Sequence, residues 1–279
     1  MDKTVYIIGD IHGCYDPLMA LEERIHAHAA RLGSEPFIVS VGDLIDRGAQ
    51  SREVVRHFYR GVREGTHTVV AGNHEAVLFE ILQAFLEDNT PEELLPQYIV
   101  PLSIQYGQSL SALGRTWESY REQRRSNWLR QGGRDTLTSL GVRAEHVETW
   151  LDALPELQFL ARLPMLWESS RTIVTHALAS AADIAYARSL ADGSRTLDRA
   201  VEEHNIHIGG LLWNRERPVV PVDPLRLHIS GHTPNTQVVY EEQLQMAIID
   251  TACVYGNKLT AWCEQTAEPL TVAGPSGNW

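Results

Sequence analysis

Three short polar motifs in this chain each follow an apolar run with the length and β-branched composition of a buried strand. The motifs are Gly42-Asp43-Leu44-Ile45-Asp46-Arg47-Gly48 after residues 37–41, Gly9-Asp10-Ile11-His12-Gly13 after residues 4–8, and Gly72-Asn73-His74-Glu75 after residues 68–71. A glycine before each polar group lets the backbone turn sharply and approach a neighbour closely. A polar turn with a local ion pair would explain any one motif, but the threefold repetition predicts a shared site.

Side chains that follow neighbouring parallel strands meet at one edge of a sheet. We therefore expect a single site that contains Asp10, His12, Asp43, Asn73 and His74. Carboxylate, imidazole and amide donors without a thiolate suit Mn, Fe or Zn. Two such ions, roughly 3.5–4 Å apart, can bind one phosphoryl group and ionise a water near neutral pH. The motifs thus predict phosphoryl hydrolysis.

The elements around these motifs predict an α/β protein. A helix is expected from Asp16, with Pro17 in its first turn, to about Leu32. A second helix begins near Ser51 and a third spans 76–87. Strand, polar loop and helix, repeated three times, is the arrangement of a parallel sheet.

From about residue 90 to residue 164 this alternation stops, and the sequence predicts several helices with short breaks. Trp128-Leu129-Arg130-Gln131-Gly132-Gly133, followed by Thr136, indicates a turn into a new helix. We interpret 90–164 as a helical cap inserted over the site, within one domain that spans 1–279. A helical layer that only covers the sheet is the alternative.

Two later strands also end in a histidine. Residues 172–175 lead to His176, and residues 227–230 lead to Gly231-His232-Thr233-Pro234. His228 shares a strand face with His232 because side chains alternate along a strand, so His228 could lie near the same site.

Other polar residues allow two interpretations. Between these strands, Arg215 or Arg217 could bind a phosphate in a bidentate manner, or both could form salt bridges in a surface turn. The remaining histidines are expected at the surface: His26, His28, His57, His67, His146, His204 and His207.

The C-terminal part of the chain predicts a hairpin and a tail. Strands are expected at 245–251 and 257–262, joined by a turn near Gly256. The final dozen residues include Pro269, Pro275 and Gly277, and they predict a loose tail.

Composition describes a globular protein with a sizeable core: 279 residues, 43% hydrophobic and 22% charged. The net charge of −12 argues against a general nucleic-acid binder, so anions must be attracted locally, by dications and a few arginines. The sequence contains no membrane-spanning run and begins directly with a strand, which favours a cytoplasmic location. The three cysteines predict no disulfide framework, and Cys14 is expected to be a small buried residue rather than a redox or ligand residue.

Taken in order, these motifs resemble the signature of the phosphoprotein phosphatase branch of the calcineurin-like metallophosphoesterases. This branch includes the bacteriophage lambda phosphatase and related bacterial serine/threonine phosphatases. The resemblance covers residues 4–82 and 172–262. It implies a four-layer α/β/β/α sandwich of two mixed sheets with the metals at one edge. The interval from Asn73 to His176 is longer than expected for the phage enzyme, which favours an inserted cap.

The resemblance also implies the ligands of two divalent metal ions, Mn by preference and otherwise Fe or Zn. They are Asp10 and His12 on the first ion, Asp43 between the two ions, and Asn73, His176 and His232 on the second ion. A hydroxide held between the ions would attack phosphorus directly. Ala177 and Ala252 stand at positions where many relatives carry other residues, which concerns substrate contacts more than metal binding.

Further roles implied by the resemblance concern acid catalysis and phosphate binding. His74 would be the general acid for the leaving oxygen, and Asp46 would orient its imidazole. Arg47, Arg215 and Asn73 would contact the phosphate.

Our first functional hypothesis is a metal-dependent phosphomonoesterase, a protein serine/threonine phosphatase acting on a phosphorylated protein or a small phosphoester. The alternative is a symmetrical dinucleoside tetraphosphate hydrolase, that is, a diadenosine tetraphosphatase. Asp46 and Glu75 favour the phosphatase, because the resemblance suggests that dinucleotide enzymes tend to lack an acid at the first position and to carry aspartate at the second. A phosphodiesterase and a non-catalytic scaffold of the same fold rank below both, and no nucleic-acid or membrane partner is expected.

Overall fold

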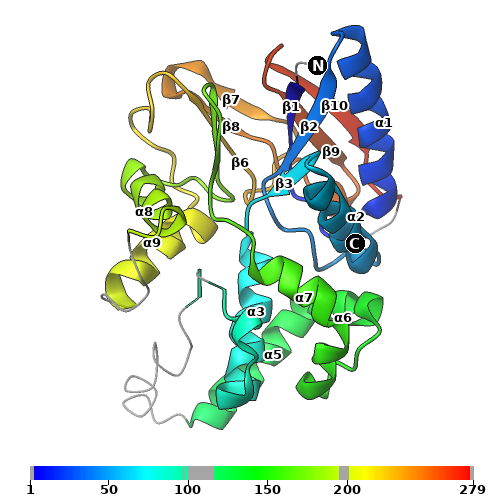
Figure 1. The fold of residues 1–279 in the computed structure, drawn as a ribbon, viewed down its shortest axis with the longest axis vertical. Helices are drawn as coiled ribbons and strands as arrows, with labels where there is room; N and C mark the ends of the chain where they lie inside the picture. Colours follow the sequence, from blue (N-terminus) through cyan, green and yellow to red (C-terminus); the bar gives the residue numbers. More distant parts are fainter. Residues whose placement is uncertain (1–2, 97, 100–115, 195–200, 277–279) are drawn as a thin grey trace.

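The protein, described here by a computed structural model over residues 3–96, 98–99, 116–194 and 201–276, contains two five-stranded sheets (Figure 1). The first sheet contains β1 (Lys3–Ile8), β2 (Glu35–Ser40), β3 (His67–Val69), β9 (Lys258–Cys263) and β10 (Glu268–Ala273). The second sheet contains β4 (Trp167–Glu168), β5 (Thr172–Val174), β6 (Leu227–Ser230), β7 (Val239–Glu241) and β8 (Met246–Ile248). Their strand orders are β10-β9-β1-β2-β3 and β4-β5-β6-β8-β7.

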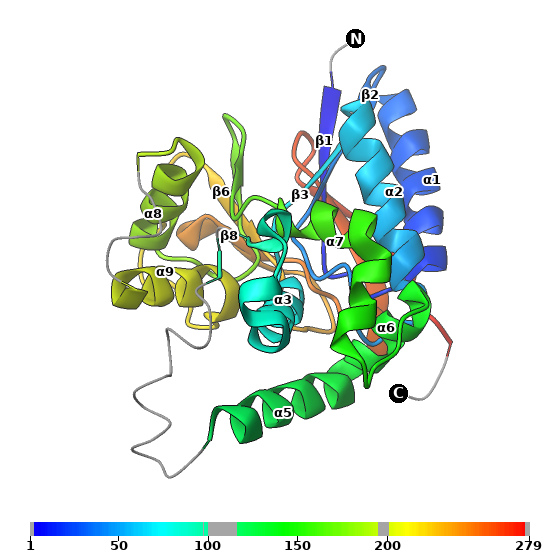
Figure 2. The same cartoon turned by 60° about the horizontal axis from the view of Figure 1, so that its bottom comes forward.

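The first sheet is parallel at its centre and antiparallel at one end. β1 pairs in parallel with β2, and β2 with β3, whereas β9 runs antiparallel to β1 and β10. Helices α1 (Tyr15–Arg31) and α2 (Ser51–Glu64) lie side by side along this sheet (Figure 2). They bury apolar side chains at helical spacing, including Leu18, Leu21 and Ile25 of α1.

The second sheet is also mixed, with β5, β6 and β8 parallel and β4 and β7 antiparallel at its edges. Helices α8 (Ala181–Ala191) and α9 (Val201–Trp213) flank it on the side away from the first sheet (Figure 1). Between the sheets lies a core in which most side chains are β-branched: Ile7, Val39, Val41, Val70, Val174, Ile229, Ala247, Ile249 and Trp262. The four-layer sandwich of two mixed sheets is thereby confirmed.

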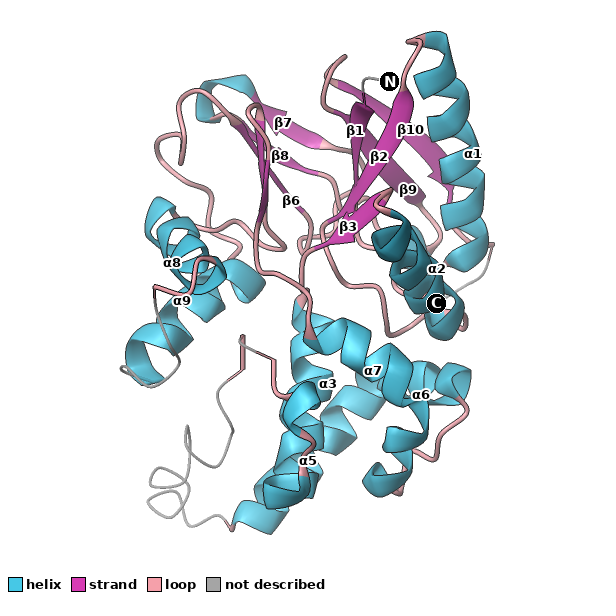
Figure 3. Cartoon of the chain, in the orientation of Figure 1, coloured by secondary structure: helices cyan, strands magenta, loops and turns pink. Residues whose placement is uncertain are grey.

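A helical region adjoins one edge of the sandwich (Figure 3). It contains α3 (Asn73–Leu86), α5 (Trp117–Trp128), a π-helical turn at Leu129–Gly133, α6 (Arg134–Leu140) and α7 (Leu154–Ala161). As expected, Leu129–Gly133 connects two helices. Short 3-10 helices occur at Glu87–Asn89, Glu92–Leu94, Val147–Ala153, Glu242–Leu244 and Cys253–Tyr255. Residues 97 and 100–115 of the predicted cap lie outside the described residues.

The third helix begins earlier than residue 76, the start that we expected. Asn73 and His74 already form the first turn of α3. Glu75 causes this early start, because its carboxylate accepts the amide N–H of Gly72 at 2.9 Å and so caps the helix. Two expected site residues therefore project from a helix N-terminus rather than from a loop.

The predicted C-terminal hairpin is wrong. β8 and β9 lie in different sheets, and each forms its hairpin with another strand: β7 with β8, and β9 with β10. The predicted tail is also wrong over most of its length, since Glu268–Ala273 forms the edge strand β10. Pro269 is tolerated there because an edge strand has amide positions that need no partner.

Two histidines expected at the surface are buried. His28 Nδ1 lies 2.8 Å from the Tyr6 hydroxyl, and His204 Nδ1 lies 2.7 Å from the Tyr186 hydroxyl. Each occupies a helix position that faces a tyrosine, so a buried partner replaces water. Cys14 is buried, as expected. Among the described residues, no helix has the length and apolar character needed to span a bilayer.

Candidate active site

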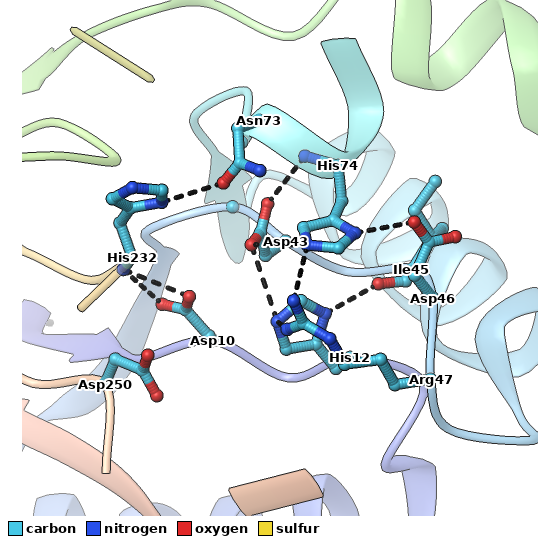
Figure 4. A network of polar contacts seen from close by, with 12 residues as sticks. Asp10, His12, Asp43, Ile45, Asp46, Arg47, Asn73, His74, His232 and Asp250 are labelled. Carbon is cyan, nitrogen blue, oxygen red and sulfur yellow. Dashed lines mark hydrogen bonds and ion pairs between the residues drawn. The ribbon is translucent and has the colours of Figure 1, made fainter. Parts of the chain in front are cut away.

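The polar motifs converge at the edge of the sandwich where the parallel strands end (Figure 4). β1 leads to Asp10 and His12, β2 leads to Asp43, and α3 begins with Asn73 and His74. The second sheet contributes His176 after β5 and His232 after β6. All seven side chains belong to one buried cluster.

Asp43 lies at the centre of this cluster. Its carboxylate is 3.5 Å from Nε2 of His12, 3.5 Å from Nε2 of His176, and accepts the backbone N–H of His74 at 3.0 Å. The Asn73 side-chain oxygen lies 2.8 Å from His176 Nε2 and 2.8 Å from His232 Nδ1. The backbone N–H of His232 donates to Asp10 at 3.1 Å. These contacts connect the ends of both sheets.

The backbone of the motif loops is strained where the ligand-type residues sit. Five polar residues of the site have positive φ angles: His12 (46°), Asp43 (51°), Asp46 (73°), Arg47 (70°) and His232 (64°). L-residues adopt this region at a cost on the order of 1 kcal/mol or more, which persists only where the surroundings enforce it. The strain indicates that these loop conformations serve to point the ligand-type side chains into the site, at a cost in local stability.

Glycine is required at two close approaches in the site. A Cβ on Gly72 would lie 2.2 Å from Oδ1 of Asp43, and a Cβ on Gly231 would lie 1.9 Å from Oδ1 of Asp10. The two carboxylates therefore pack directly against bare backbone.

Glu75 holds the loop that carries Asp43. Its two carboxylate oxygens accept the backbone N–H groups of Gly72, Asp43 and Leu44 at 2.9–3.0 Å, and that of Ile45 at 3.4 Å. Burial and the nearby Asp43 raise the pKa of Glu75 to about 7. Glu75 is fully buried and positions the loop rather than substrate.

Hydrogen bonds fix the orientation of two imidazoles for metal binding. Nδ1 of His12 lies 2.8 Å from the carbonyl oxygen of Ile45, and Nδ1 of His176 lies 2.8 Å from that of Val41. Because a carbonyl can only accept, each Nδ1 carries the proton, and each Nε2 directs a lone pair into the cluster. This is the usual arrangement of metal-binding histidines.

The electrostatics also fit bound cations. Burial lowers the pKa of His12 and of His176, and lowers that of His232 to about 3, which favours the neutral form that metals bind. Burial, Asp250 and Asp43 raise the pKa of Asp10. Buried carboxylates that disfavour one another's charge are stabilised by a cation. The donor set therefore fits a divalent metal centre, whose ligands would be Asp10, His12, Asp43, Asn73, His176 and His232.

His74 and Asp46 form a close pair. Nδ1 of His74 lies 2.6 Å from Oδ2 of Asp46, which also accepts the indole N–H of Trp128 at 2.6 Å. The Thr136 hydroxyl donates to Oδ1 of Asp46 at 2.6 Å. Burial opposes a charged imidazole, but Asp43 and Asp46 raise the pKa of His74 overall. Asp46 thus binds the Nδ1 proton of His74 and turns Nε2 toward the pocket, where Nε2 accepts from Arg47.

The arginines differ in position. Arg47 extends between His12 and His74, with Nη2 2.8 Å from Nε2 of His74 (Figure 4). Nε of Arg215 lies 3.2 Å from Nε2 of His232. Arg217 pairs with Glu241 outside the pocket, so of the two candidates only Arg215 reaches the site.

His228 does not line this pocket. It is buried, its Nε2 lies 2.7 Å from the Thr175 hydroxyl, and burial lowers its pKa to about 4.

Sequence reasoning missed three residues that complete the site. Asp250 is buried beside Asp10 and Asp43, and its position after a short apolar run was the same strand-end signal that identified the other ligands. Trp128 and Thr136 bind Asp46 from 82 and 90 residues away, and no local pattern indicated this contact.

The cluster forms the floor of a pocket of about 750 Å³. Its walls include Arg130, Gly132 and Arg134 from the α5–α6 region, and the exposed rings of Trp213 and Tyr255. The carbonyl of Gly132 accepts the Arg47 backbone N–H at 3.2 Å, which joins the helical region to the second motif.

The calcineurin-like phosphoesterase family model matches residues 3–247. The chain belongs to this family. The family implies a centre of two divalent metal ions, in agreement with the donor set described above.

Similar curated proteins match only part of the chain. A symmetrical bis(5'-nucleosyl)-tetraphosphatase from Cellvibrio japonicus is 37% identical over 93 residues, which is 33% of this chain and 32% of the relative. The asymmetrical bis(5'-nucleosyl)-tetraphosphatase PrpE from Halalkalibacterium halodurans is 42% identical over 73 residues, 24% of this chain and 29% of the relative. The chain thus matches about a third of the length of these relatives.

Solved structures show the same fold over nearly the whole chain. A protein serine/threonine phosphatase from Saccharomyces cerevisiae has a TM-score of 0.55 at 12% identity, covering 100% of this chain and 81% of that one. A cold-active protein-tyrosine phosphatase from a Shewanella species has a TM-score of 0.53 at 16% identity, covering 97% and 80%. The predicted family is confirmed, but the curated relatives are tetraphosphatases and do not support the narrower lambda-phosphatase branch.

Proposed function

We propose that this protein is a metal-dependent hydrolase of dinucleoside tetraphosphates. The observation that carries the proposal is the number of arginines in one pocket: Arg47, Arg130, Arg134 and Arg215. A phosphomonoester presents one terminal phosphate, for which the two arginines beside the ligand cluster suffice. The other two, Arg130 in the Leu129–Gly133 turn and Arg134 at the start of α6, extend the positive lining to where a longer polyphosphate chain would lie, although Arg134 also lies 3.6 Å from Glu145.

Exposed aromatic rings beside the cluster support a nucleotide substrate. Trp213 is 44% exposed and packs edge-on against His232, with ring centroids 5.9 Å apart. Tyr255 is 52% exposed and lies against the Arg47 guanidinium at 5.6 Å. Nucleobases stack on such rings with about 1–3 kcal/mol per base. The tetraphosphatase relatives, which match about a third of this chain, agree with this substrate class.

Asp46 and Glu75, the two residues that favoured the phosphatase, do not line the pocket and so are not placed to contact a substrate. Asp46 and Glu75 are both fully buried, Asp46 beneath His74 and Glu75 beneath the 43–45 loop. Their carboxylates bind protein groups only. We infer that these two acids set the conformation of the 43–45 loop and the orientation of the His74 imidazole, and that they do not determine the choice of substrate.

In the proposed reaction, the protein's own residues bind and orient the phosphate chain. Arg47 and Arg215 would bind the non-bridging oxygens of the phosphoryl group under attack, and Asn73 would orient it. Two divalent cations, when bound, would polarise the phosphoryl oxygens and lower the pKa of water. His74, held through Nδ1 by Asp46, would supply a proton from Nε2 to the leaving oxygen.

A second candidate is a phosphomonoesterase, which includes the protein serine/threonine phosphatase. The His74–Asp46 pair favours it, because an alkoxide leaving group needs a proton more than a nucleoside phosphate does. The substitution His74→Asn tests this role of the pair. It should lower kcat by roughly 10²–10⁴-fold on a phosphoserine peptide with metal retained, and much less on diadenosine tetraphosphate. Loss of metal in this variant would show that His74 is a ligand.

The polyphosphate proposal is tested by removing one distal arginine. In Arg134→Ala, the KM for diadenosine tetraphosphate should rise about 10-fold or more, since an arginine–phosphate contact contributes roughly 1.5–3 kcal/mol. The KM for p-nitrophenyl phosphate should not change. Arg217→Ala, which removes an arginine outside the pocket, is the matched control. Equal effects of R134A on both substrates would contradict the proposal.

A further inference from the structure

A second group of ligand-type side chains lies away from the active site, on the helix-covered side of the first sheet. Glu22 of α1, His57 of α2 and His67 at the start of β3 place one ligand atom each within 4.8 Å of one another. Oε1 of Glu22 is 2.7 Å from Nε2 of His57 and 3.4 Å from Nε2 of His67. The side chains are only 10%, 16% and 10% exposed, which contradicts the expectation of two surface histidines.

One tautomer of His67 leaves its Nε2 free to bind a metal. The Thr66 hydroxyl lies 3.2 Å from the carbonyl oxygen of Gly61 and 2.8 Å from Nδ1 of His67, and its one proton can be donated to either. When the hydroxyl donates to Gly61, it accepts the Nδ1 proton of His67, and Nε2 of His67 carries a lone pair. That lone pair faces the carboxylate of Glu22, which is also an acceptor. Two acceptors that face each other are stabilised by a cation between them.

The surrounding backbone is built to admit His67. A Cβ on Gly61 would lie 2.1 Å from Nδ1 of His67, so only glycine leaves room for the ring. Glycine in a helix interior costs about 1 kcal/mol relative to alanine. The presence of Gly61 in α2 is explained by the imidazole of His67, which packs directly against it.

We propose that Glu22, His57 and His67 form a binding site for a third divalent metal ion, of the Zn²⁺ class. Two imidazoles and one carboxylate are borderline donors that suit Zn²⁺, with a further position open to water. The Thr66 hydroxyl is placed to accept the Nδ1 proton of a metal-bound His67, as outer groups do in zinc sites. The ion would connect α1, α2 and β3, and it shares no ligand with the active site.

The test counts Zn²⁺ bound to the whole protein. Metal-free wild type, His57→Gln and His67→Gln are equilibrated with Zn²⁺, and bound zinc is measured by mass spectrometry. Each variant should bind one equivalent less than wild type and keep its kcat. His146→Gln, at an exposed histidine outside the cluster, should bind as wild type does. The active site is identical in all four proteins. The expected difference in bound zinc therefore does not depend on whether the proposed function is correct.

Equal zinc content in wild type and both variants would overturn the proposal and leave Glu22 and His67 as an ion pair only. A second measurement needs no variant. Wild-type crystals grown with Zn²⁺ should show an anomalous peak at the zinc edge among Glu22, His57 and His67. Peaks at the active site with none at this cluster would also overturn the proposal.

Discussion

At the scale of single residues, the active site concentrates negative charge that the apoprotein cannot stabilise. Asp10, Asp43 and Asp250 are 2–5% exposed and lie close enough to shift one another's titration. Burial raises the pKa of Asp250 to about 6, and Asp43 adds to the rise. We therefore expect these carboxylates to function as ligands or neighbours of bound cations, which neutralise their charge.

The substitution Asp250→Asn should therefore have opposite effects on stability and on metal binding. Removing a buried charge should raise the melting temperature of the metal-free protein. It should weaken metal affinity by about 10–100-fold, as is usual for groups around a metal centre. Calorimetry and metal titration measure the two effects. Asp152→Asn, at an exposed acid, should change neither, and a metal-free D250N less stable than wild type would refute the charge argument.

Glu75 carries a second prediction at this scale. Glu75→Ala would leave the buried N–H groups of Gly72, Asp43 and Leu44 without their acceptor. Unpaired buried donors cost about 1–3 kcal/mol each, so the free energy of unfolding should fall by roughly 3 kcal/mol or more. Glu75→Gln keeps one acceptor oxygen and should lose less. Urea unfolding of both variants checks the order, and equal losses would mean that side-chain volume matters more than the hydrogen bonds.

At the scale of elements, the α5–α6 region is joined to the second motif. Trp128 and Thr136 bind the carboxylate of Asp46, and Gly132 binds the backbone of Arg47. We propose that this region is the substrate cap, since it also supplies Arg130 and Arg134 to the pocket.

Trp128→Phe tests this connection, because it removes the indole N–H that holds Asp46. With Asp46 less constrained, the orientation of His74 should loosen and kcat should fall by about 10-fold on a phosphoester, with KM little changed. Trp117→Phe makes the same change at the other end of α5, where the indole binds Glu87, and it should leave kcat unaltered. Equal kcat in W128F and wild type would show that the indole does not position the catalytic pair.

The elements also show what the sequence could predict. Each motif was predicted because its strand, glycine and ligands are consecutive in the chain. The hairpin was wrong because strand pairing is not local: β8 and β9 are neighbours in sequence but pair within different sheets. The contacts of Asp46 with Trp128 and Thr136 were not predicted for the same reason, since they depend on how the helical region packs.

At the scale of the whole molecule, buried neutral histidines predict acid sensitivity. Burial lowers the pKa of His228 to about 4 from 6.5, so between these values the unfolded chain binds a proton that the folded protein does not. Stability should therefore fall as pH decreases from 6.5 to 4, by on the order of 3 kcal/mol for this residue. His204, whose pKa burial also lowers to about 4, acts in the same direction.

Unfolding of the metal-free protein across this pH range measures the effect. His228→Gln should reduce the slope of stability against pH, whereas His146→Gln, at an exposed residue, should not. An unchanged slope in H228Q would mean that other groups determine the acid limit.

The whole pocket, with its ligand cluster, four arginines and two exposed rings, is the basis of the proposed function. The most direct test is the ratio of kcat/KM for diadenosine tetraphosphate to kcat/KM for a phosphoserine peptide, measured on the Mn²⁺-loaded wild-type protein. We predict a ratio well above one, with nucleotide products that also show whether cleavage is symmetrical or asymmetrical. A ratio below one, with tetraphosphate cleavage no faster than in metal-free protein, would contradict the account and identify the protein as a phosphomonoesterase.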